Sequence, residues 1–273
     1  MKNITFVGAG NMARALIVGL IAIGYPPEKL IASNPDIEKL KSFQEQFGIY
    51  LLNDNCEAIK EADIVVLAVK PNVLPKVCEE IKAVVLQKKP LVISIAAGVP
   101  MQALSRWLDP TISIVRAMPN TPAAVSAGAT GLFANDKTTD KQKDEAEALF
   151  RAVGVTVWAG VEKQMDLITA VSGSGPAYYF LVMEAMQEAA HRMGLSEESA
   201  RLLSLQTVLG AARMAMESQH DVSQLRRSVT SPDGTTEAAI RVFENGNIKD
   251  LFEKAVRAAF QRAQELVQQI EKE

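Results

Sequence analysis

The sequence predicts an α/β protein, with a Rossmann-like, doubly wound N-terminal domain followed by an all-α C-terminal domain. Three observations support this prediction. The chain begins with a strand, a glycine turn and a helix. Short apolar runs then alternate with segments of helical periodicity up to residue 160, which is typical of a sheet with crossover helices. No strand pattern follows, so we place the two domains at residues 1–160 and 161–273.

The first strand and the turn after it carry the earliest functional signal. Residues 4–7 are apolar and β-branched, which predicts a buried strand, and residues 8–13 read Gly-Ala-Gly-Asn-Met-Ala before a helix. Gly8 permits a tight turn, Gly10 lets the backbone approach phosphates, and Ala13 allows close packing of helix and strand. The helix N-terminus would hold the anion through its free N–H groups and its dipole. We therefore predict a dinucleotide site, with a purely structural turn as the alternative.

The end of the second predicted strand, residues 30–32, bears on the choice of cofactor. It lies about 20 residues past the glycine turn, where enzymes strict for NAD tend to place a carboxylate against the ribose 2′-OH. Ser33 and Asn34 stand there instead, and these small polar residues do not repel a 2′-phosphate. Asp36 is two residues further on and could cap the next helix. No arginine stands beside it to bind a phosphate, so we expect NADP and keep NAD open.

The rest of the N-terminal half continues the alternation. Further strands are predicted at residues 49–52, 64–69, 91–95 and 112–115, edge strands at 132–133 and 155–158, and helices at 37–47, 74–86, 101–108 and 141–153. The run 64–69 is apolar without alternation, as expected of a parallel strand that is covered on both faces. Pro119 and Pro122 bracket a predicted rigid, extended loop at the carboxyl edge of the sheet, where such sheets bind ligands.

Two further turns end strands at this edge. Lys70, after the strand 64–69, would either approach a phosphate or remain solvated. Ala96 and Ala97 are small residues at a strand end, which would leave room for a nicotinamide ribose or merely mark a tight turn.

The C-terminal half is predicted to contain four or five helices. One begins at residues 165–171, is interrupted at 172–176, and continues over 177–193. Gly194 is the expected C-terminal stop, and Ser196 the expected N-cap of the next helix. Apolar stripes on both helices favour a core or a subunit interface over a cofactor site. Because long helices without a sheet need a surface to bury against, we predict an obligate homodimer.

The segment 229–239 is dense in hydroxyl groups around a Pro-Asp-Gly turn. One interpretation is a capped helix, with Thr235 or Thr236 at the N-cap. The other is a carboxylate-binding site, since hydroxyls and N–H donors converge at a helix N-terminus. Spacing alone leaves both open.

Composition excludes several classes of protein. The net charge of −3 gives no electrostatic reason to expect nucleic acid or an anionic membrane as a partner. Cys56 and Cys78 are isolated, and His191 and His220 lie far apart, so neither a disulfide framework nor a metal site is predicted. No run reaches transmembrane length. We expect a cytoplasmic protein.

Three motifs occur in order behind the dinucleotide fold, namely Met-Pro-Asn-Thr-Pro at 118–122, Val-Ser-Gly-Ser-Gly-Pro-Ala-Tyr at 171–178 and Thr-Ser-Pro-Asp-Gly-Thr-Thr-Glu-Ala-Ala at 230–239. Together they resemble the pyrroline-5-carboxylate reductase family, over essentially the whole chain. The resemblance implies an oxidoreductase in which NAD(P)H delivers hydride to the C=N carbon of 1-pyrroline-5-carboxylate, yielding L-proline in the last step of proline biosynthesis. It also implies a helical domain that builds an intertwined homodimer and binds substrate, with a decamer of dimers as a larger assembly.

The resemblance also assigns roles to residues. The implied cofactor-binding residues are Val7, Gly8, Gly10, Asn11, Met12, Asn34, Asn55, Ala68, Val69, Lys70, Pro71, Ala96 and Ala97. The implied substrate-binding residues are Ser231, Gly234, Thr235 and Thr236, to which Ser174 of the second motif is added. Thr236 matches the hydroxyl near the ring nitrogen and is the predicted catalytic residue. Asp233 stands where the family usually has glycine, and we expect its side chain to point outward because it would repel a carboxylate.

This chemistry needs few special groups. A cyclic imine can arrive protonated, so no strong general acid is required, and catalysis would consist mainly of orientation. One alternative is a β-hydroxyacid dehydrogenase, but the expected lysine is absent between Val171 and Met193. The other is a non-catalytic dinucleotide-binding regulator, for which Asp233 in the substrate turn is the single hint.

Overall fold

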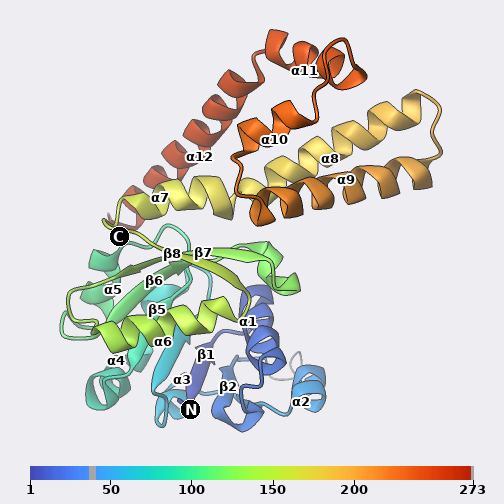
Figure 1. Cartoon of the computed structure of the whole chain (residues 1–273). Helices are drawn as coiled ribbons and strands as arrows, with labels where there is room; N and C mark the ends of the chain where they lie inside the picture. Colours follow the sequence, from blue (N-terminus) through green and yellow to red (C-terminus); the bar gives the residue numbers. More distant parts are fainter. Residues whose placement is uncertain (37–40, 272–273) are drawn as a thin grey trace. The chain divides into compact units, whose positions relative to one another are not determined.

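The computed structural model describes residues 1–36 and 41–271, and it divides into two compact units that we treat separately. Unit 1 consists of Met1–Ser174 with Ala258–Glu273, and unit 2 of Gly175–Arg257 (Figure 1). These limits differ from the predicted boundary at residue 160. The physical reason is packing in unit 1: Ile168 lies against Gly131 of the sheet, and Leu266 lies against Gly98.

Unit 1 is built on one sheet with the strand order β3-β2-β1-β4-β5-β6-β7-β8 within the described residues. The strands are β1 Ile4–Val7, β2 Leu30–Ser33, β3 Tyr50–Leu52, β4 Ile64–Leu67, β5 Leu91–Ser94, β6 Ile114–Met118, β7 Gly128–Ala134 and β8 Gly154–Trp158. Neighbouring strands are parallel except β6 and β7. The order reverses between β1 and β4, so the dinucleotide-binding switch point of a doubly wound sheet lies there. The predicted Rossmann-like fold class is confirmed.

Helices cover both faces of this sheet. Among the described residues of unit 1, the helices besides the last part of α12 (Ile248–Glu271) are α1 Asn11–Ala22, η1 Pro27–Lys29, α2 Lys41–Phe47, α3 Asn55–Ile59, α4 Leu74–Lys88, α5 Met101–Trp107, η3 Thr121–Val125, α6 Asp140–Arg151, α7 Gln164–Ile168 and η4 Thr169–Gly173. One core packs α1 and α6 against the sheet, through residues such as Leu16 and Phe150. The other packs α3, α4 and α5, through residues such as Ile81 and Leu104. Burial on both faces explains the apolar runs in the strands. Of the predicted helix 37–47, residues 37–40 lie outside the described residues.

The predicted extended loop after β6 is wrong in two respects. Arg116 to Met118 belong to β6, because β7 pairs antiparallel with it as far as Met118 and Gly131. The chain must therefore reverse in the few residues between the two strands. It does so through the 3-10 helix η3, and Ser126 ends that helix with a φ of +56°.

The predicted interruption at residues 172–176 is also wrong. The chain passes from α7 through one π-helical turn, η4, almost directly into α8. Ser174 N–H donates to the Thr169 carbonyl at 2.9 Å, the i→i−5 bond of a π turn. Asn120 stabilises this turn from the sheet side, since its Nδ2 donates to the Ser172 carbonyl at 2.9 Å.

Asn120 is only 7% exposed, and its Oδ1 also accepts the Ala129 N–H at 2.9 Å. Substituting alanine would leave two main-chain groups without this partner. We expect Asn120→Ala to lower the free energy of unfolding by about 1–3 kcal/mol. Urea denaturation measures the change, with Asn72→Ala, at an exposed position, as the control. Equal stability of the two variants would show that Asn120 does not stabilise the turn.

Unit 2 contains the helices α8 Gly175–Arg192, α9 Glu197–Glu217, α10 Val222–Ser228 and α11 Thr235–Asn245, and the first part of α12 Ile248–Glu271. The predicted stop at Gly194 is confirmed, with a φ of +109°. The predicted N-cap is confirmed as well, because Ser196 Oγ accepts from Ser199 N–H. Six α-helices follow residue 160 in the described part of the chain, more than the four or five predicted. Asp221 and Gln224 form a capping box that starts the short α10 as a separate helix.

Apolar side chains cover much of the surface of unit 2. Phe180 is 62% exposed, Leu203 56% and Met214 56%, whereas Ala200 and Ser204 are buried. Among the described residues, no helix is long and apolar enough to cross a bilayer. The other described residues of unit 2 leave these apolar side chains exposed.

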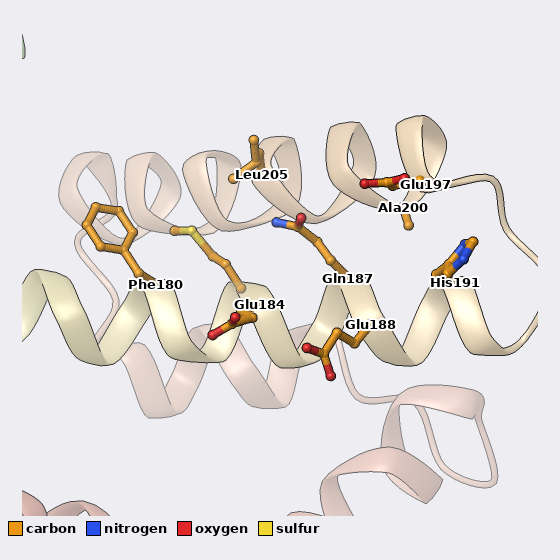
Figure 2. Close-up of a pocket in the computed structure, with 9 residues that line it drawn as sticks. Phe180, Glu184, Gln187, Glu188, His191, Glu197, Ala200 and Leu205 are labelled. Atoms are coloured by element: carbon orange, nitrogen blue, oxygen red, sulfur yellow. The ribbon is translucent and has the colours of Figure 1, made fainter.

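Unit 2 contains a groove of about 700 Å³ between α8 and α9. Figure 2 shows Phe180 and Gln187 extending from α8 toward α9, which contributes Ala200 and Leu205. None of the predicted site residues lines this groove.

Candidate functional site

The glycine turn sits where three strand ends meet. Gly8 has a φ of +93°, and a Cβ there would lie 2.7 Å from the Ala68 carbonyl oxygen. Gly8 N–H donates to the Ser33 carbonyl at 2.8 Å, and Ala68 N–H donates to the Val7 carbonyl at 2.8 Å. These bonds tie the carboxyl ends of β1, β2 and β4 together. Only glycine fits this conformation and this clearance.

The N-terminus of α1 is open toward this edge. Gly10 is the N-cap, no side chain caps the helix, and no acidic residue lies in its first turn. Gly10 is exposed, and a Cβ there would meet no atom within 4 Å. Beside it lies a cavity of about 450 Å³, lined by Asn11, Met12, Arg14, Ala15, Val18, Thr121 and Ala124. An uncapped helix N-terminus with free space in front of it fits the pyrophosphate of a dinucleotide.

The end of β2 presents small polar groups. Asn34 Oδ1 accepts from Asp36 N–H at 2.9 Å, and Asn34 N–H donates to the Leu52 carbonyl at 3.1 Å. Ser33 Oγ donates to Asn55 Oδ1 at 2.5 Å. The predicted cap by Asp36 concerns a helix start at residues 37–40, outside the described residues. Asn34 and Asn55 thus stand at the position where a dinucleotide fold meets the adenosine ribose.

Two more loops complete the cofactor set at the same edge. Ala68 and Val69 are half-buried directly after β4, while Lys70 is exposed beside Pro71. Ala96 N–H donates to Ser94 Oγ at 3.4 Å, and Ala96 and Ala97 are half-buried after β5. Because β2, β1, β4 and β5 are adjacent and parallel, their carboxyl ends share one edge of the sheet. The structure brings the predicted cofactor residues together there, and their binding roles stay predictions.

The hydroxyl-rich segment of unit 2 forms a tight turn at the start of α11. Gly234 N–H donates to the Ser231 carbonyl at 3.1 Å, and Asp233 has a φ of +58°. Gly234 is the N-cap, so neither Thr235 nor Thr236 caps the helix as the first interpretation required. The reason is that Asp233 adopts a left-handed backbone conformation, which ends the turn there and makes the next residue, Gly234, the N-cap. Both threonines fall in the first turn of α11, exposed and free of a capping role.

The positive φ at Asp233 accounts for the glycine that the resemblance places there. Aspartate tolerates this conformation better than most residues. Its N–H donates to Glu237 Oε2 at 3.0 Å, and the residue is exposed. Ser174, the remaining predicted substrate residue, is half-buried at the end of unit 1. The predicted substrate set is therefore divided between the two units.

Sequence reasoning missed one charged group in unit 1. Arg116 lies in the middle of β6 with its side chain 8% exposed, and it forms an ion pair with Glu162. Glu162 Oε1 also accepts from Met101 N–H, at the start of α5, at 2.6 Å. Burial raises the pKa of the neighbouring Asp166 carboxyl. A lone arginine inside the apolar run Ile-Val-Arg-Ala-Met was the available signal, and the pair anchors residues 162–166 to the sheet.

Thiol and metal chemistry have little support in the described residues. Cys56 and Cys78 are free, and burial raises the pKa of the Cys78 thiol to about 12. Burial, with the nearby carboxylates, also raises the pKa of Cys56. A protonated thiol is a poor nucleophile. Among the described residues, no cluster of three or more His, Cys, Asp or Glu could hold a metal ion.

Comparison with known proteins decides the family. Residues 162–266 match the family model described as pyrroline-5-carboxylate reductase dimerisation, and residues 3–98 match that of the coenzyme F420-dependent NADP oxidoreductases. A pyrroline-5-carboxylate reductase of Pseudomonas aeruginosa is 48% identical over 268 residues, 98% of each chain. The chain belongs to the pyrroline-5-carboxylate reductase family. A second such reductase, from Vibrio alginolyticus, is 43% identical over 97% of each chain.

Solved structures of pyrroline-5-carboxylate reductases share the whole fold. That of Coxiella burnetii has a TM-score of 0.94 and 54% identity, covering 97% of this chain and 98% of its own. The structure of a pyrroline carboxylate reductase of Plasmodium falciparum, with NADP bound, has a TM-score of 0.86 and 30% identity over the same shares. The predicted family is confirmed.

Proposed function

We propose that this protein reduces the C=N bond of 1-pyrroline-5-carboxylate with NADPH, yielding L-proline in the last step of proline biosynthesis. The observation that carries the proposal is the match over 98% of the chain to a relative named for this reaction. That match spans both the open glycine turn and the hydroxyl-rich turn of α11. We assign residues 1–160 to dinucleotide binding and residues 161–273 to dimerisation and substrate binding.

The chain's own residues orient the cofactor and the substrate, and none of them is needed to activate the imine. When bound, reduced nicotinamide would supply a hydride for the imine carbon, and the protonated nitrogen would take up the π electrons of the C=N bond. The N–H groups at the start of α1 hold the pyrophosphate, and Ala96 and Ala97 leave room for the nicotinamide ribose. Ser231, Gly234 and the start of α11 hold the substrate carboxylate, and Ser174 adds a polar contact. Thr236 Oγ1 is the hydroxyl that we place beside the ring nitrogen of the substrate, where a hydrogen bond would stabilise the developing amine.

We propose NADPH as the preferred donor. At the end of β2 the chain has Asn34, where an NAD-specific enzyme tends to have a carboxylate. A structural relative with 30% identity carries NADP. The ratio of kcat/KM for NADPH to that for NADH tests this preference, and a ratio below one would reverse it.

We infer a homodimer from the exposed apolar faces of unit 2. Phe180, Leu203 and Met214 are each more than half exposed, and residues 162–266 match a dimerisation model. A second copy that covered these faces would remove a large apolar area from water, which stabilises the folded unit. Phe180 also lines the groove of Figure 2.

Light scattering on the eluting protein measures the assembly. A mass of two chains supports the dimer. A larger mass would show that dimers assemble further, as in a decamer of dimers, and a stable monomer would contradict the proposal. A cytoplasmic location is part of the proposal, and cell fractionation tests it.

One assay separates the proposal from its alternatives. The protein is mixed with NADPH and racemic 1-pyrroline-5-carboxylate, the absorbance of the reduced cofactor is followed, and the product is resolved by chiral chromatography. Oxidation of NADPH with formation of L-proline is the expected result. Activity on a 3-hydroxyacid instead would favour a β-hydroxyacid dehydrogenase. Dinucleotide binding without turnover of either substrate would favour a regulator.

A further inference from the structure

Three side chains from three different elements form a chain of hydrogen bonds at the end of β2. Ser33 is the last residue of β2, Asn55 is the first of α3, and Glu80 lies in the middle of α4. Ser33 Oγ donates to Asn55 Oδ1 at 2.5 Å. Asn55 Nδ2 donates to Glu80 Oε1 at 3.1 Å. No feature of the sequence pattern pointed to Glu80.

Glu80 determines which way the Asn55 amide faces. The Ser33 hydroxyl can either donate to an amide oxygen or accept from an amide nitrogen, so it does not distinguish the two orientations. The Glu80 carboxylate only accepts, and a flipped amide would place Oδ1 against it. The charge-assisted bond from Nδ2 therefore selects the observed orientation.

The backbone around Glu80 is itself fixed. Cys56 Sγ donates to the main-chain carbonyl of Glu80 at 3.3 Å, which joins α4 to the residue that follows Asn55. On the other side, the Ser33 carbonyl accepts the Gly8 N–H of the glycine turn at 2.8 Å. The orientation of Asn55 is thus built into the same framework as the phosphate-binding turn.

We propose that Glu80 is a positioning residue for the dinucleotide, acting through Asn55. The bond from Ser33 uses one of the two acceptor sites of Asn55 Oδ1, and the bond to Glu80 uses one of the two hydrogens of Asn55 Nδ2. The second acceptor site and the second hydrogen are left for a ligand. At the end of β2 that ligand is the adenosine ribose with its 2′ substituent. Glu80 itself does not contact the cofactor in this proposal, because Asn55 lies between them. The inference rests on the proposed dinucleotide site and extends it to a side chain in α4.

The test is a comparison of variants at Glu80. Glu80→Ala frees the amide to rotate, and we expect it to raise the Kd for NADPH about 5–10-fold. At saturating NADPH, kcat should stay within about twofold of the parent, because the reacting end of the site is unchanged. Glu80→Gln offers an amide that can donate as well as accept, so it no longer selects one orientation of Asn55 and should also raise the Kd for NADPH. Kd is measured by calorimetric titration, and the Tm of the unliganded protein is recorded for each variant.

A double-mutant cycle asks whether Glu80 acts through Asn55. If it does, Glu80→Ala has no further effect on Kd in an Asn55→Ala background. Glu79→Ala, at the exposed neighbouring glutamate, is the matched control and should bind like the parent.

Additive effects of the two alanine substitutions would overturn the inference. So would parental affinity for NADPH in Glu80→Gln, or an unchanged Kd in Glu80→Ala. A parent protein that binds no dinucleotide would instead refute the proposed function, and the inference with it.

Discussion

Gly10→Ala is expected to weaken NADPH binding about 100-fold while leaving the unliganded fold intact. Gly10 has a φ of −71°, which alanine adopts without strain. An added Cβ would meet no protein atom within 4 Å, so the substitution creates no clash within the chain. The same open space is where the pyrophosphate must approach the start of α1. A methyl group there would displace the phosphate from the N–H groups that hold it.

Gly8→Ala is the contrasting variant, because its cost falls on the protein itself. An added Cβ would lie 2.7 Å from the Ala68 carbonyl oxygen and 2.8 Å from Val69 Cγ1, at a φ of +93°. This variant should therefore lower the Tm of the unliganded protein as well as its affinity for NADPH. Gly10→Ala should keep the parental Tm. Thermal unfolding and calorimetric titration of both variants provide the comparison.

Parental affinity in Gly10→Ala would contradict the placement of the pyrophosphate. A fall of Tm in that variant would show that Gly10 has a structural role that its open surroundings do not explain.

The sequence was most informative where structure depends on neighbours along the chain. Apolar runs without alternation predicted the buried parallel strands, because both faces of the sheet are covered by helices. The N-cap at Ser196 and the stop at Gly194 depend on residues a few positions away, and both are confirmed. Strand ends were displaced by a few residues, since pairing with a neighbouring strand decides where β6 stops.

Contacts between distant residues could not be predicted in this way. Asn120 stabilises the π turn across 52 positions of the chain, and Arg116 meets Glu162 across 46. Neither pair leaves a periodic pattern in the sequence. The bond between Asn55 and Glu80 belongs to the same class, because it depends on α3 lying beside α4.

The substrate turn shows a local failure of a different kind. Threonine before a helix is a good N-cap signal, yet the cap is Gly234. Asp233 adopts a positive φ, which moves the helix start so that Thr235 is its first residue. This miss is functionally informative, since a threonine that does not cap the helix keeps its hydroxyl for a ligand.

Thr236→Val is accordingly expected to lower kcat by about 10–100-fold. Valine matches threonine in shape and lacks only the hydroxyl. Thr236 is exposed in the first turn of α11, and within the described part of the chain its side chain takes no part in the cap. The hydroxyl that we place beside the ring nitrogen would be lost without a change in the turn. Because NADPH contacts the other unit's residues in our proposal, its Kd should stay at the parental value.

Thr236→Ser is the matched control, because it restores the hydroxyl and removes only a methyl group. We expect its kcat to recover to within a few-fold of the parent. Steady-state kinetics with 1-pyrroline-5-carboxylate at saturating NADPH measures both variants, and circular dichroism checks that α11 is retained. A parental kcat in Thr236→Val would remove this hydroxyl from the mechanism. In that case orientation by the carboxylate-binding turn and the dinucleotide would have to account for catalysis, which protonation of the imine before binding allows.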